Sequence, residues 1–545
     1  MRKLFFSLIS SLLLTNCINK DPVDLIIHNA TIISIDPMNN LYEAIAVKNG
    51  KIIALGKENQ ILNKYSSKNT IDLKSNFLYP GFIDAHCHFL AFGIEENQIN
   101  LKGCTSFDQV VERCVKNHTN ENWIIGNGWD QNLWKSNTFP NKEKLDSLFP
   151  NNPVALYRVD GHALLANQKA LDLAGITKET KIKGGHVEIL NNQLTGILVD
   201  NAIDYISNAI EEPSEGQKKK ALLMAQKKCL ASGLTTVDDA GLNKKDIFLI
   251  DKLHQSGELK IRIYAMLSDN KENFDYFIDS LKKPYITERL AVRAVKFYSD
   301  GALGSRGACL IKPYSDVSDS EHFGMLLNTT EHFRKSAQKL LAANYQMCTH
   351  AIGDSAARII LTIYGEALKG INDKRWRLEH AQVINQNDFD LFREYSIIPS
   401  VQPTHATSDM LWAILRLGKN RIKNSYAYAK LLYQNGTIAL GTDFPIEQIN
   451  PIHTFYAAVA RKNLNGQPKN GFQIENALTR LEALQGMTIW AAMANFEEDK
   501  KGSLEIGKAA DLVVLDKDLL LVEEDEILKT KVLYTFIHGE QLYKN

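Results

Sequence analysis

The middle of the chain alternates short apolar segments with spacers of helix length. Each segment is short enough for a buried strand, and turn residues or a helical pattern follow it. Apolar strands that alternate with helices at this number predict an α/β fold, the parallel (β/α)8 or TIM barrel. The eight segments begin at Gly81, Gly233, Ile261, Ala291, Tyr345, Arg375, Ser396 and Thr437.

Both ends of the chain show another pattern, made of shorter strands. Residues 24–73 hold brief apolar runs broken by Asn, Gly and Pro, and the KNGK stretch at Lys48–Lys51 is a two-residue hairpin signal. Residues 501–545 repeat this style. Because neither end buries a sandwich core alone, we predict one small β-sandwich domain built from residues 22–79 and 501–545.

The barrel is assigned to residues 80–500, and its first loop is long. The spacer between the first and second predicted strands far exceeds the length of one helix. We therefore predict an inserted subdomain at about residues 94–215, over the barrel mouth.

The chain begins with a pattern that is typical of a secretory signal. Arg2 and Lys3 precede an apolar run from Leu4 to Leu14, so residues 1–16 are predicted to be a signal peptide. An eleven-residue helix spans about 16 Å, too short for the roughly 30 Å hydrocarbon core of a bilayer. The LLTNC stretch resembles the bacterial lipoprotein box. This predicts an exported protein, lipidated at Cys17 and anchored in the bacterial cell envelope.

One residue departs from the lipoprotein box, since Asn16 stands where a small Gly, Ala or Ser is usual. Simple secretion is therefore the alternative.

The charge balance excludes a polyanionic partner. Lys and Arg total 63, Asp and Glu also total 63, and no long block of either sign occurs. We expect neither nucleic acid nor an anionic membrane surface as a partner, so membrane contact is expected only through Cys17. A homodimer is one assembly that the sequence leaves open.

Histidine and aspartate stand at the carboxyl ends of predicted strands, where a barrel places its active site. His86 and His88 are two residues apart, so a strand points both rings to one side. His350, His380 and Asp443 end the fifth, sixth and eighth strands. A single histidine at such a place is more often a core residue. Together these residues form a ligand set for zinc or a similar divalent ion.

Lys296 interrupts the apolar strand AVKFY. A buried lysine usually loses its proton, forms an ion pair or extends outward. The alternative to an outward or paired lysine is a neutral amine that has captured carbon dioxide and become an anionic carbamate.

Taken together, the stretches PGFIDAHCH, VKFYSDGALGSRGA, THAIGD, RLEHAQ, LGTDFP and GSLEIGKAADLVVLD resemble the metal-dependent amidohydrolase superfamily. The likeness is greatest to its family-3 branch, which includes N-substituted formamide deformylase, and it covers nearly all the chain after the signal. The resemblance implies two divalent metal ions, expected to be zinc. One would bind His86, His88 and Asp443, the other His350 and His380, and carboxylated Lys296 would bridge them.

The resemblance also implies hydrolysis of a C–N bond in a small amide, N-acyl or N-formyl compound. Two divalent ions about 3.5 to 4 Å apart lower the pKa of a shared water and so supply hydroxide near neutral pH. Asp443 would act as the general base and then as the acid for the departing amine. The alternatives are a non-catalytic sensor or regulator on the same barrel, and hydrolysis of an ester or phosphoester or an isomerisation.

Six further residues are predicted near the substrate, each beside a structural alternative. The DGH pattern of His162 resembles a family segment near the metals, although His162 would also cap a turn. Arg306 would hold a substrate carboxylate or fix its own loop. Trp129 would form an aromatic wall or a subdomain core, and the core is the safer reading. The six residues are His162, Asp300, Arg306, His405, Trp129 and Asp130.

Overall fold

The computed structural model describes residues 20–117, 123–317 and 321–545. The predicted signal peptide and Cys17 lie outside these residues. At the centre is the predicted barrel, which is confirmed: eight parallel strands follow each other in chain order around the sheet, with the short antiparallel strand β19 (Tyr285–Ile286) beside β20. The barrel strands are β10 (Phe82–Cys87), β17 (Leu234–Leu242), β18 (Arg262–Ser268), β20 (Leu290–Tyr298), β21 (Gln346–Ala351), β22 (Arg377–His380), β23 (Ile398–Val401) and β24 (Ala439–Leu440).

The barrel closes where β24 leads into the first strand. The Asp443 backbone N–H donates to the His86 carbonyl at 2.7 Å, and the His88 N–H donates to the Phe444 carbonyl at 2.8 Å. Gly441 permits this approach, because a Cβ there would lie 2.5 Å from the His86 nitrogen. Closure therefore sets Asp443 directly beside the two histidines of the first strand.

Helices cover the outside of the barrel. Along α11, Ala356, Ile360 and Ile363 are buried at helical spacing, which turns one apolar face onto the strands. Side-chain caps set several helix starts, as where the Ser214 hydroxyl accepts from the Gln217 N–H. The helices around the barrel are α2 (Phe89–Glu95), α7 (Glu215–Ala231), α8 (Lys244–Gln255), α9 (Lys271–Asn273), α10 (Thr330–Ala343), α11 (Asp354–Leu368), α12 (Asp390–Glu394), α13 (Pro403–Asp409), α14 (Ala413–Arg421), α15 (Tyr428–Asn435), α16 (Pro451–Ala460), α17 (Arg480–Gly486) and α18 (Ile489–Ala494).

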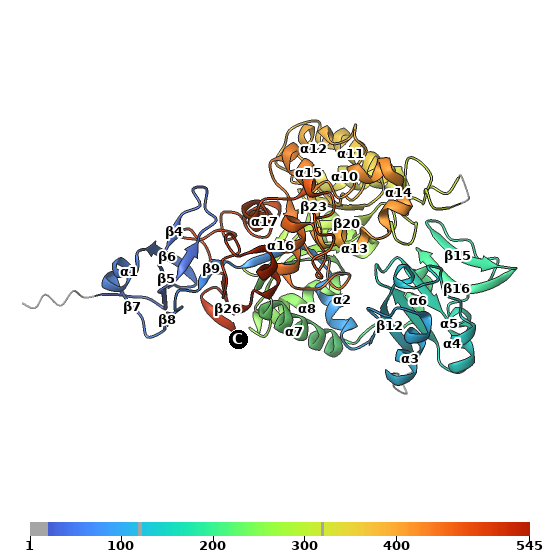
Figure 1. The fold of residues 1–545 in the computed structure, drawn as a ribbon, viewed down its shortest axis with the longest axis horizontal. Helices are drawn as coiled ribbons and strands as arrows, with labels where there is room; N and C mark the ends of the chain where they lie inside the picture. Colours follow the sequence, from blue (N-terminus) through green and yellow to red (C-terminus); the bar gives the residue numbers. More distant parts are fainter. Residues whose placement is uncertain (1–19, 118–122, 318–320) are drawn as a thin grey trace, which may run out of the picture.

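Both ends of the chain build two packed sheets at one end of the molecule, where the first strands lie beside β26 (Figure 1). Residues from both ends, such as Leu25, Val47, Leu512 and Phe536, share one core. The four-stranded sheet is β6 (Lys51–Gly56), β5 (Ala44–Lys48), β2 (Leu25–His28) and β8 (Thr70–Asp72). The six-stranded sheet is β27 (Glu540–Lys544), β26 (Val532–Ile537), β25 (Leu512–Leu515), β9 (Phe77–Pro80), β3 (Thr31–Ile33) and β4 (Leu41–Tyr42).

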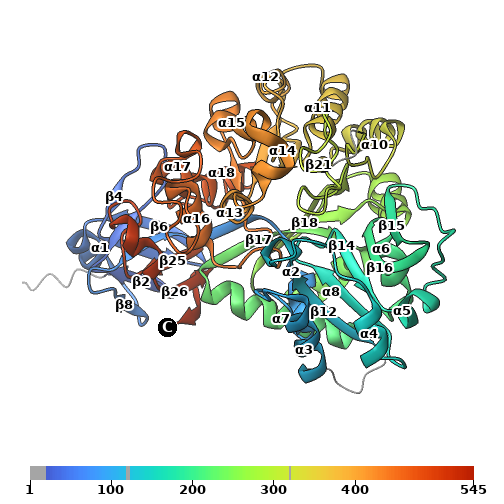
Figure 2. The same cartoon turned by 45° about the vertical axis from the view of Figure 1, so that its right-hand side comes forward.

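A third sheet follows the first barrel strand and lies on the opposite side of the barrel from the terminal sheets (Figure 2). It is mixed, with helices α3 (Phe107–Asn117), α4 (Glu143–Leu148), α5 (Gln168–Leu173) and α6 (Ile203–Ala209). Trp129 is buried in its core, where its indole N–H donates to the Leu156 carbonyl at 2.7 Å. The strand order is β11 (Ile99–Asn100), β12 (Ile124–Trp129), β13 (Val154–Arg158), β14 (Ala163–Ala166), β16 (Gln193–Asp200) and β15 (Gly185–Leu190).

Two further findings concern the described ranges as a whole. No helix within them has both the length and the apolar composition that crossing a membrane requires. The six cysteines within them, Cys87 to Cys348, are free thiols.

Candidate metal centre

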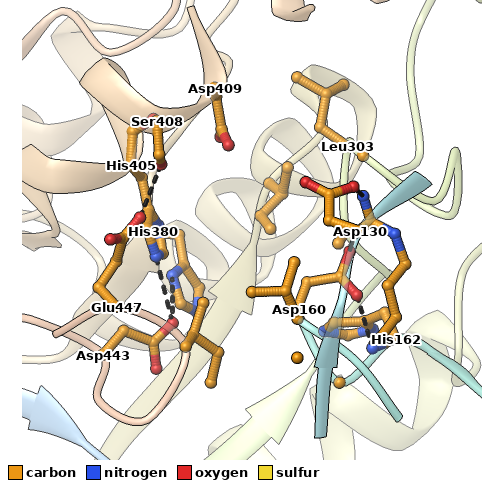
Figure 3. Close-up of a pocket in the computed structure, with 18 of the residues that line it drawn as sticks. Asp130, Asp160, His162, Leu303, His380, His405, Ser408, Asp409, Asp443 and Glu447 are labelled. Atoms are coloured by element: carbon orange, nitrogen blue, oxygen red, sulfur yellow. Dashed lines mark hydrogen bonds and ion pairs between the residues drawn. The ribbon is translucent and has the colours of Figure 1, made fainter. Parts of the chain in front are cut away.

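A cavity of about 640 Å³ opens at the carboxyl ends of the barrel strands. Two walls face each other across it (Figure 3). The barrel side, as we name it, carries His88, Lys296, His350, His380, His405 and Asp443, with His86 buried behind it. The insertion side carries Asp130, Arg158, Asp160 and His162. Strand ends and inserted sheet therefore form one site together.

His86 and His88 direct the same ring nitrogen towards Asp443. His88 Nδ1 donates to the Ala240 carbonyl at 2.9 Å, and because a carbonyl only accepts, Nε2 of the neutral ring keeps its lone pair. His86 Nδ1 lies 2.5 Å from a Glu379 carboxylate oxygen. The two Nε2 atoms lie 3.7 Å (His86) and 3.3 Å (His88) from Asp443 Oδ1. An outer acceptor on Nδ1 with a free Nε2 is the usual arrangement of a metal-binding histidine.

Asp443 is buried, and its Oδ1 has no hydrogen-bond partner among the described residues. Its φ of 61° lies in the left-handed region, held there by the backbone bond that closes the barrel. Burial alone would raise the pKa of Asp443, but the adjacent rings of His88, His86 and His380 hold it well below its usual range. The carboxylate is therefore an ionised acceptor with an unsatisfied oxygen.

Lys296 points into the barrel, so the interpretation that its side chain extends outward is wrong. Its side chain is 1% exposed, and Nζ lies 3.0 Å from His86 Nε2 and 4.7 Å from the centre of the Tyr298 ring. Burial lowers the pKa of Lys296 despite the nearby carboxylates of Glu379 and Asp443. The amine therefore lies beside His86 Nε2, the ring nitrogen that would bind a metal ion.

His380 and His405 stack almost in parallel, with ring centres 6.0 Å apart at 16°. His380 Nδ1 lies 2.8 Å from Gln402 Oε1 and 3.9 Å from Asp443 Oδ2. His405 Nε2 lies 3.7 Å from the same Asp443 oxygen. Figure 3 shows both rings turned towards Asp443.

His350 lies on the far side of His380, with ring centres 4.5 Å apart. Its Nε2 faces the Gly301 carbonyl at 3.5 Å and an Asp300 oxygen at 3.6 Å. Burial and the neighbouring His162 lower the pKa of His350 well below its usual value. The ring is therefore neutral, as a metal ligand must be.

These residues fit a divalent ion. Two groups of three each bring one ligand atom per residue within 4.8 Å of one another: His86, His88 and Asp443, and His380, His405 and Asp443. Imidazole nitrogens with one carboxylate are a catalytic zinc set that leaves a position open for water or substrate. The unpaired Asp443 oxygen supports this fit, because such an atom is costly when buried without a cation or donor.

Arg377 and Glu379 form a buried ion pair beneath the site that the sequence reading missed. Arg377 Nε lies 2.7 Å from Glu379 Oε1, and Arg377 Nη1 lies 2.9 Å from an Asp238 oxygen. Burial opposes ionisation of Glu379, but Arg377 and His86 lower its pKa to about 2. The sequence held a signal for this pair. In the strand RLEH, Arg377 and Glu379 are two residues apart, so both charged side chains point to the side opposite Leu378, into the barrel.

On the insertion side, His162 is oriented by a buried carboxylate. His162 Nδ1 lies 2.7 Å from Asp200 Oδ1, and the ring centre lies 5.1 Å from that of His350. Gly301 and Gly307 of the barrel make room for Asp200, because a Cβ on either would lie 2.4 Å from one of its oxygens. This pair therefore crosses from the insertion to the barrel.

Asp130 also lines the cavity on this side. Its Oδ1 pairs with Arg158 Nη2 at 2.6 Å, and Arg158 pairs with Asp160 as well. The Arg158 charge is thus shared by two carboxylates of the wall.

Three of the expected substrate contacts are absent from the described cavity lining. Asp300 is buried behind it, where it accepts the backbone N–H groups of Ile352 and Gly353 at 3.0 and 2.8 Å. Arg306 instead forms a two-point pair with Asp316, at 2.9 and 3.3 Å, which fixes its own loop. Trp129 lies in the core of the inserted sheet. Each of these three side chains is already bound by, or packed against, neighbouring groups of the protein.

Comparison with known proteins agrees with the fold and the site. The model of the amidohydrolase family matches residues 69–543. The chain belongs to the amidohydrolase family. This confirms the resemblance drawn from the motifs.

Relatives of this amidohydrolase extend over nearly its full length. The protein LONG AFTER FAR-RED 3 of Arabidopsis thaliana is 32% identical and covers 95% of this chain and 91% of its own. N-substituted formamide deformylase of Arthrobacter pascens is 26% identical over 96% of this chain and 98% of its own. An uncharacterized metal-dependent hydrolase from Pyrococcus furiosus superposes with a TM-score of 0.72 at 27% identity, over 91% of this chain and 100% of that one. Family, fold and ligand set identify a metal-dependent hydrolase.

Proposed function

We propose that this protein hydrolyses a C–N bond of a small amide, N-acyl or N-formyl compound, with divalent metal ions held on the barrel side. The observation that carries the proposal is the ionised, unsatisfied carboxylate of Asp443, which lines the cavity together with several histidines. N-substituted formamide deformylase, the relative at 26% identity, is named for removal of a formyl group from nitrogen. This name supports an N-formyl or N-acyl substrate.

The ion, zinc in our proposal, supplies an acidified water molecule and a Lewis acid for the scissile carbonyl. Asp443 accepts the proton of the attacking water and returns it to the departing nitrogen, so that an amine leaves and a carboxylic acid remains. The barrel closure fixes Asp443 for this work, because its backbone N–H is bonded to His86. His86, His88, His350 and His380 are proposed ligands together with Asp443.

Lys296 is proposed to carry a carbamate that completes the centre. Its buried amine has a lowered pKa, so a neutral Nζ with a lone pair is accessible. The lone pair forms a bond to the carbon of carbon dioxide, and the nitrogen releases a proton. The anion that results would stand where Nζ now lies 3.0 Å from His86 Nε2. The carbamate would put a metal ligand, in place of a hydrogen-bond donor, beside His86 Nε2.

The insertion side is proposed to bind the rest of the substrate. His162, Asp130 and the barrel residue His405 line the cavity. A cavity of about 640 Å³ lies within the range of small-molecule sites. A small organic amide, rather than a protein or nucleic acid, is therefore the proposed partner.

Export and lipidation at Cys17 are proposed from the sequence alone. Arg2, Lys3 and the apolar run from Leu4 to Leu14 support cleavage before Cys17. The mass of the mature protein checks this. A mature chain that retains residues 1–16 would contradict it.

The test of the function pairs metal analysis with a substrate panel. The metal-loaded protein is offered N-formyl and N-acyl amines, dipeptides, cyclic amides, and esters of matched size, and acid and amine products are quantified. We expect turnover of N-formyl or N-acyl compounds. Turnover of esters alone would show another bond as the target, and no turnover despite full metal loading would favour the non-catalytic sensor.

A further inference from the structure

Asp409, the last residue of α13, lines the cavity beyond the histidines of the barrel side. Its Oδ2 accepts the side-chain amide of Gln382 at 2.6 Å and the hydroxyl of Tyr426 at 2.8 Å. Within the described ranges both hydrogen bonds of the carboxylate end on Oδ2, which leaves Oδ1 without one. Figure 3 shows the carboxylate directed into the space between the two walls. The free oxygen is therefore open to a bound molecule.

Buried partners fix the direction of this carboxylate. Tyr426 is fully buried, and Gln382 is 4% exposed. The Gln382 amide also donates to the Tyr426 hydroxyl at 2.7 Å, and the Tyr426 backbone N–H donates to the Gln382 carbonyl at 2.7 Å. The three side chains thus form a closed triangle of hydrogen bonds. A carboxylate held in this way loses little freedom when a ligand binds, which favours affinity.

Arg158 and Lys102 line the same cavity, but their charges are directed elsewhere. Arg158 pairs with Asp130 and Asp160, and the Lys102 amine donates to a backbone carbonyl of the barrel. Asp409 forms no ion pair with any residue in the described ranges. The cavity therefore presents a carboxylate that no cation among these residues neutralises.

The pKa of Asp409 is consistent with this lack of a cation. Burial, with Glu447 and Asp130 nearby, raises the pKa of Asp409 to about 7, although His405 and the Tyr426 hydroxyl act in the opposite sense. A positive charge beside Oδ1 would favour the ionised form. A cationic ligand is therefore the kind that this carboxylate would bind best.

Trp412 gives the same corner of the cavity an apolar surface. It lines the cavity, and its backbone N–H donates to the Asp409 carbonyl at 3.0 Å. Gly304 permits the close approach of the indole, because a Cβ there would lie 3.2 Å from the Trp412 ring. Aromatic side chains bury large apolar areas of their partners. A group with an alkyl stem and a charged end therefore fits this corner.

We propose that the substrate carries an ammonium or guanidinium group at the end of its N-substituent, and that Asp409 Oδ1 binds this group. The proposal rests on the C–N hydrolysis function and names its substrate class. The charge is placed on the nitrogen side of the amide because a formyl group has no side chain to carry it. An ionised carboxylate forms strong hydrogen bonds with a cation, whereas a neutral alkyl end would leave Oδ1 without a donor. Asp409 thus determines specificity and takes no part in bond cleavage.

The first test measures binding and needs no turnover. Calorimetry compares butylguanidinium with uncharged pentanol on the Zn²⁺-loaded full chain. The guanidinium group has no lone pair for a metal ion, so its binding does not depend on coordination. We expect butylguanidinium to bind wild type about 10- to 100-fold more tightly than pentanol. Equal affinities would overturn the proposal, and this comparison needs no variant.

Asp409→Asn locates the effect. The amide oxygen of this variant still accepts from Tyr426 and Gln382, but an NH₂ group replaces Oδ1, so the preference for butylguanidinium should disappear. Asp390→Asn is the matched control, because it removes the same charge from the exposed surface of α12, where Asp390 lies 3.7 Å from Arg393. The control should keep the wild-type preference. A preference that persists in Asp409→Asn would overturn the proposal.

A second test uses turnover. Two formamides are compared, one with an aminobutyl and one with a pentyl substituent on nitrogen. We expect kcat/KM of wild type to be about 10- to 100-fold higher for the aminobutyl compound, through KM and not through kcat, with the ratio near one in Asp409→Asn. Hydrolysis of both compounds at equal kcat/KM would overturn the cation site and leave the C–N hydrolysis proposal standing. Hydrolysis of neither, with tight binding of butylguanidinium retained, would support the cation site and contradict the hydrolysis proposal.

Discussion

The two walls of the cavity use histidine in opposite ways. On the barrel side, burial and the nearby Lys296 lower the pKa of His86 to about 4, and burial and His350 lower that of His380 well below its usual value. On the insertion side, burial opposes protonation of His162, but the hydrogen bond and the charge of Asp200 raise its pKa. A neutral ring keeps a lone pair for a metal ion, whereas the raised pKa of His162 favours its protonated form, in which both ring nitrogens donate.

The difference indicates that the two parts of the chain contribute different groups to one site. The barrel side holds groups that keep lone pairs for a cation, and beneath them Glu379, paired with Arg377, fixes the His86 ring. The insertion side holds ion pairs and the His162–Asp200 pair, and these groups face the cavity. We therefore expect substitutions on the barrel side to change metal content and chemistry, and substitutions on the insertion side to change substrate binding.

The largest effect is expected for Asp443→Asn. The amide keeps an oxygen for an ion but does not accept a proton near neutral pH, so kcat should fall by about 100- to 10,000-fold. Metal analysis of the same sample separates loss of chemistry from loss of ions, and we expect bound metal to remain. Full activity in this variant would remove Asp443 from the mechanism.

Glu379→Gln should lower both the stability of the protein and its affinity for metal. It leaves the buried Arg377 short of one charge, which should cost about 3 kcal/mol of unfolding free energy in urea titrations. It also weakens the acceptor of His86 Nδ1, so metal affinity should fall roughly 10- to 100-fold.

Glu366→Gln is the matched control for that prediction, because Glu366 pairs with Arg334 on the surface. It should change stability by about 1 kcal/mol or less and leave metal affinity as it is. Equal effects of the two variants would show that the buried pair has no special role.

Asp200→Asn should affect the insertion side alone. Without the carboxylate, His162 loses the partner that favours its charged form, so kcat/KM should fall on the order of tenfold, the size of one hydrogen bond to a charged group. The metal content should equal that of the wild type. A loss of metal would mean that the two walls do not divide their work as described.

The smallest effect is expected for Arg306→Ala. Its pair with Asp316 is partly exposed, and Arg416 also reaches Asp316, so stability should fall by about 1 kcal/mol or less. KM for the best substrate should stay the same, since Arg306 does not reach the described cavity lining. A raised KM for substrates with a carboxylate would restore Arg306 as a substrate contact.

The barrel side was largely predictable from sequence because strand periodicity and strand ends set its geometry. The spacing of His86 and His88 fixed a shared direction, and the ends of β21, β22 and β24 meet at one face. Arg377 and Glu379 carried the same period-two signal.

The insertion side was less predictable because tertiary contacts decide it. His162 acquires its role through Asp200, 38 residues away, in a niche left by two glycines of the barrel. Arg306 had suitable chemistry for a substrate carboxylate, but Asp316 takes up its guanidinium. The stacking of His405 on His380 likewise depends on how α13 turns after its strand.

Removal and return of metal tests the central claim most directly, namely that ions on the barrel side carry out the hydrolysis. The full chain is stripped with a chelator, and hydrolysis of the best N-formyl or N-acyl substrate is measured before stripping, after it, and after Zn²⁺ is restored. We expect the rate to fall to that of the uncatalysed reaction and to return with Zn²⁺. Undiminished hydrolysis by the metal-free protein would contradict the account.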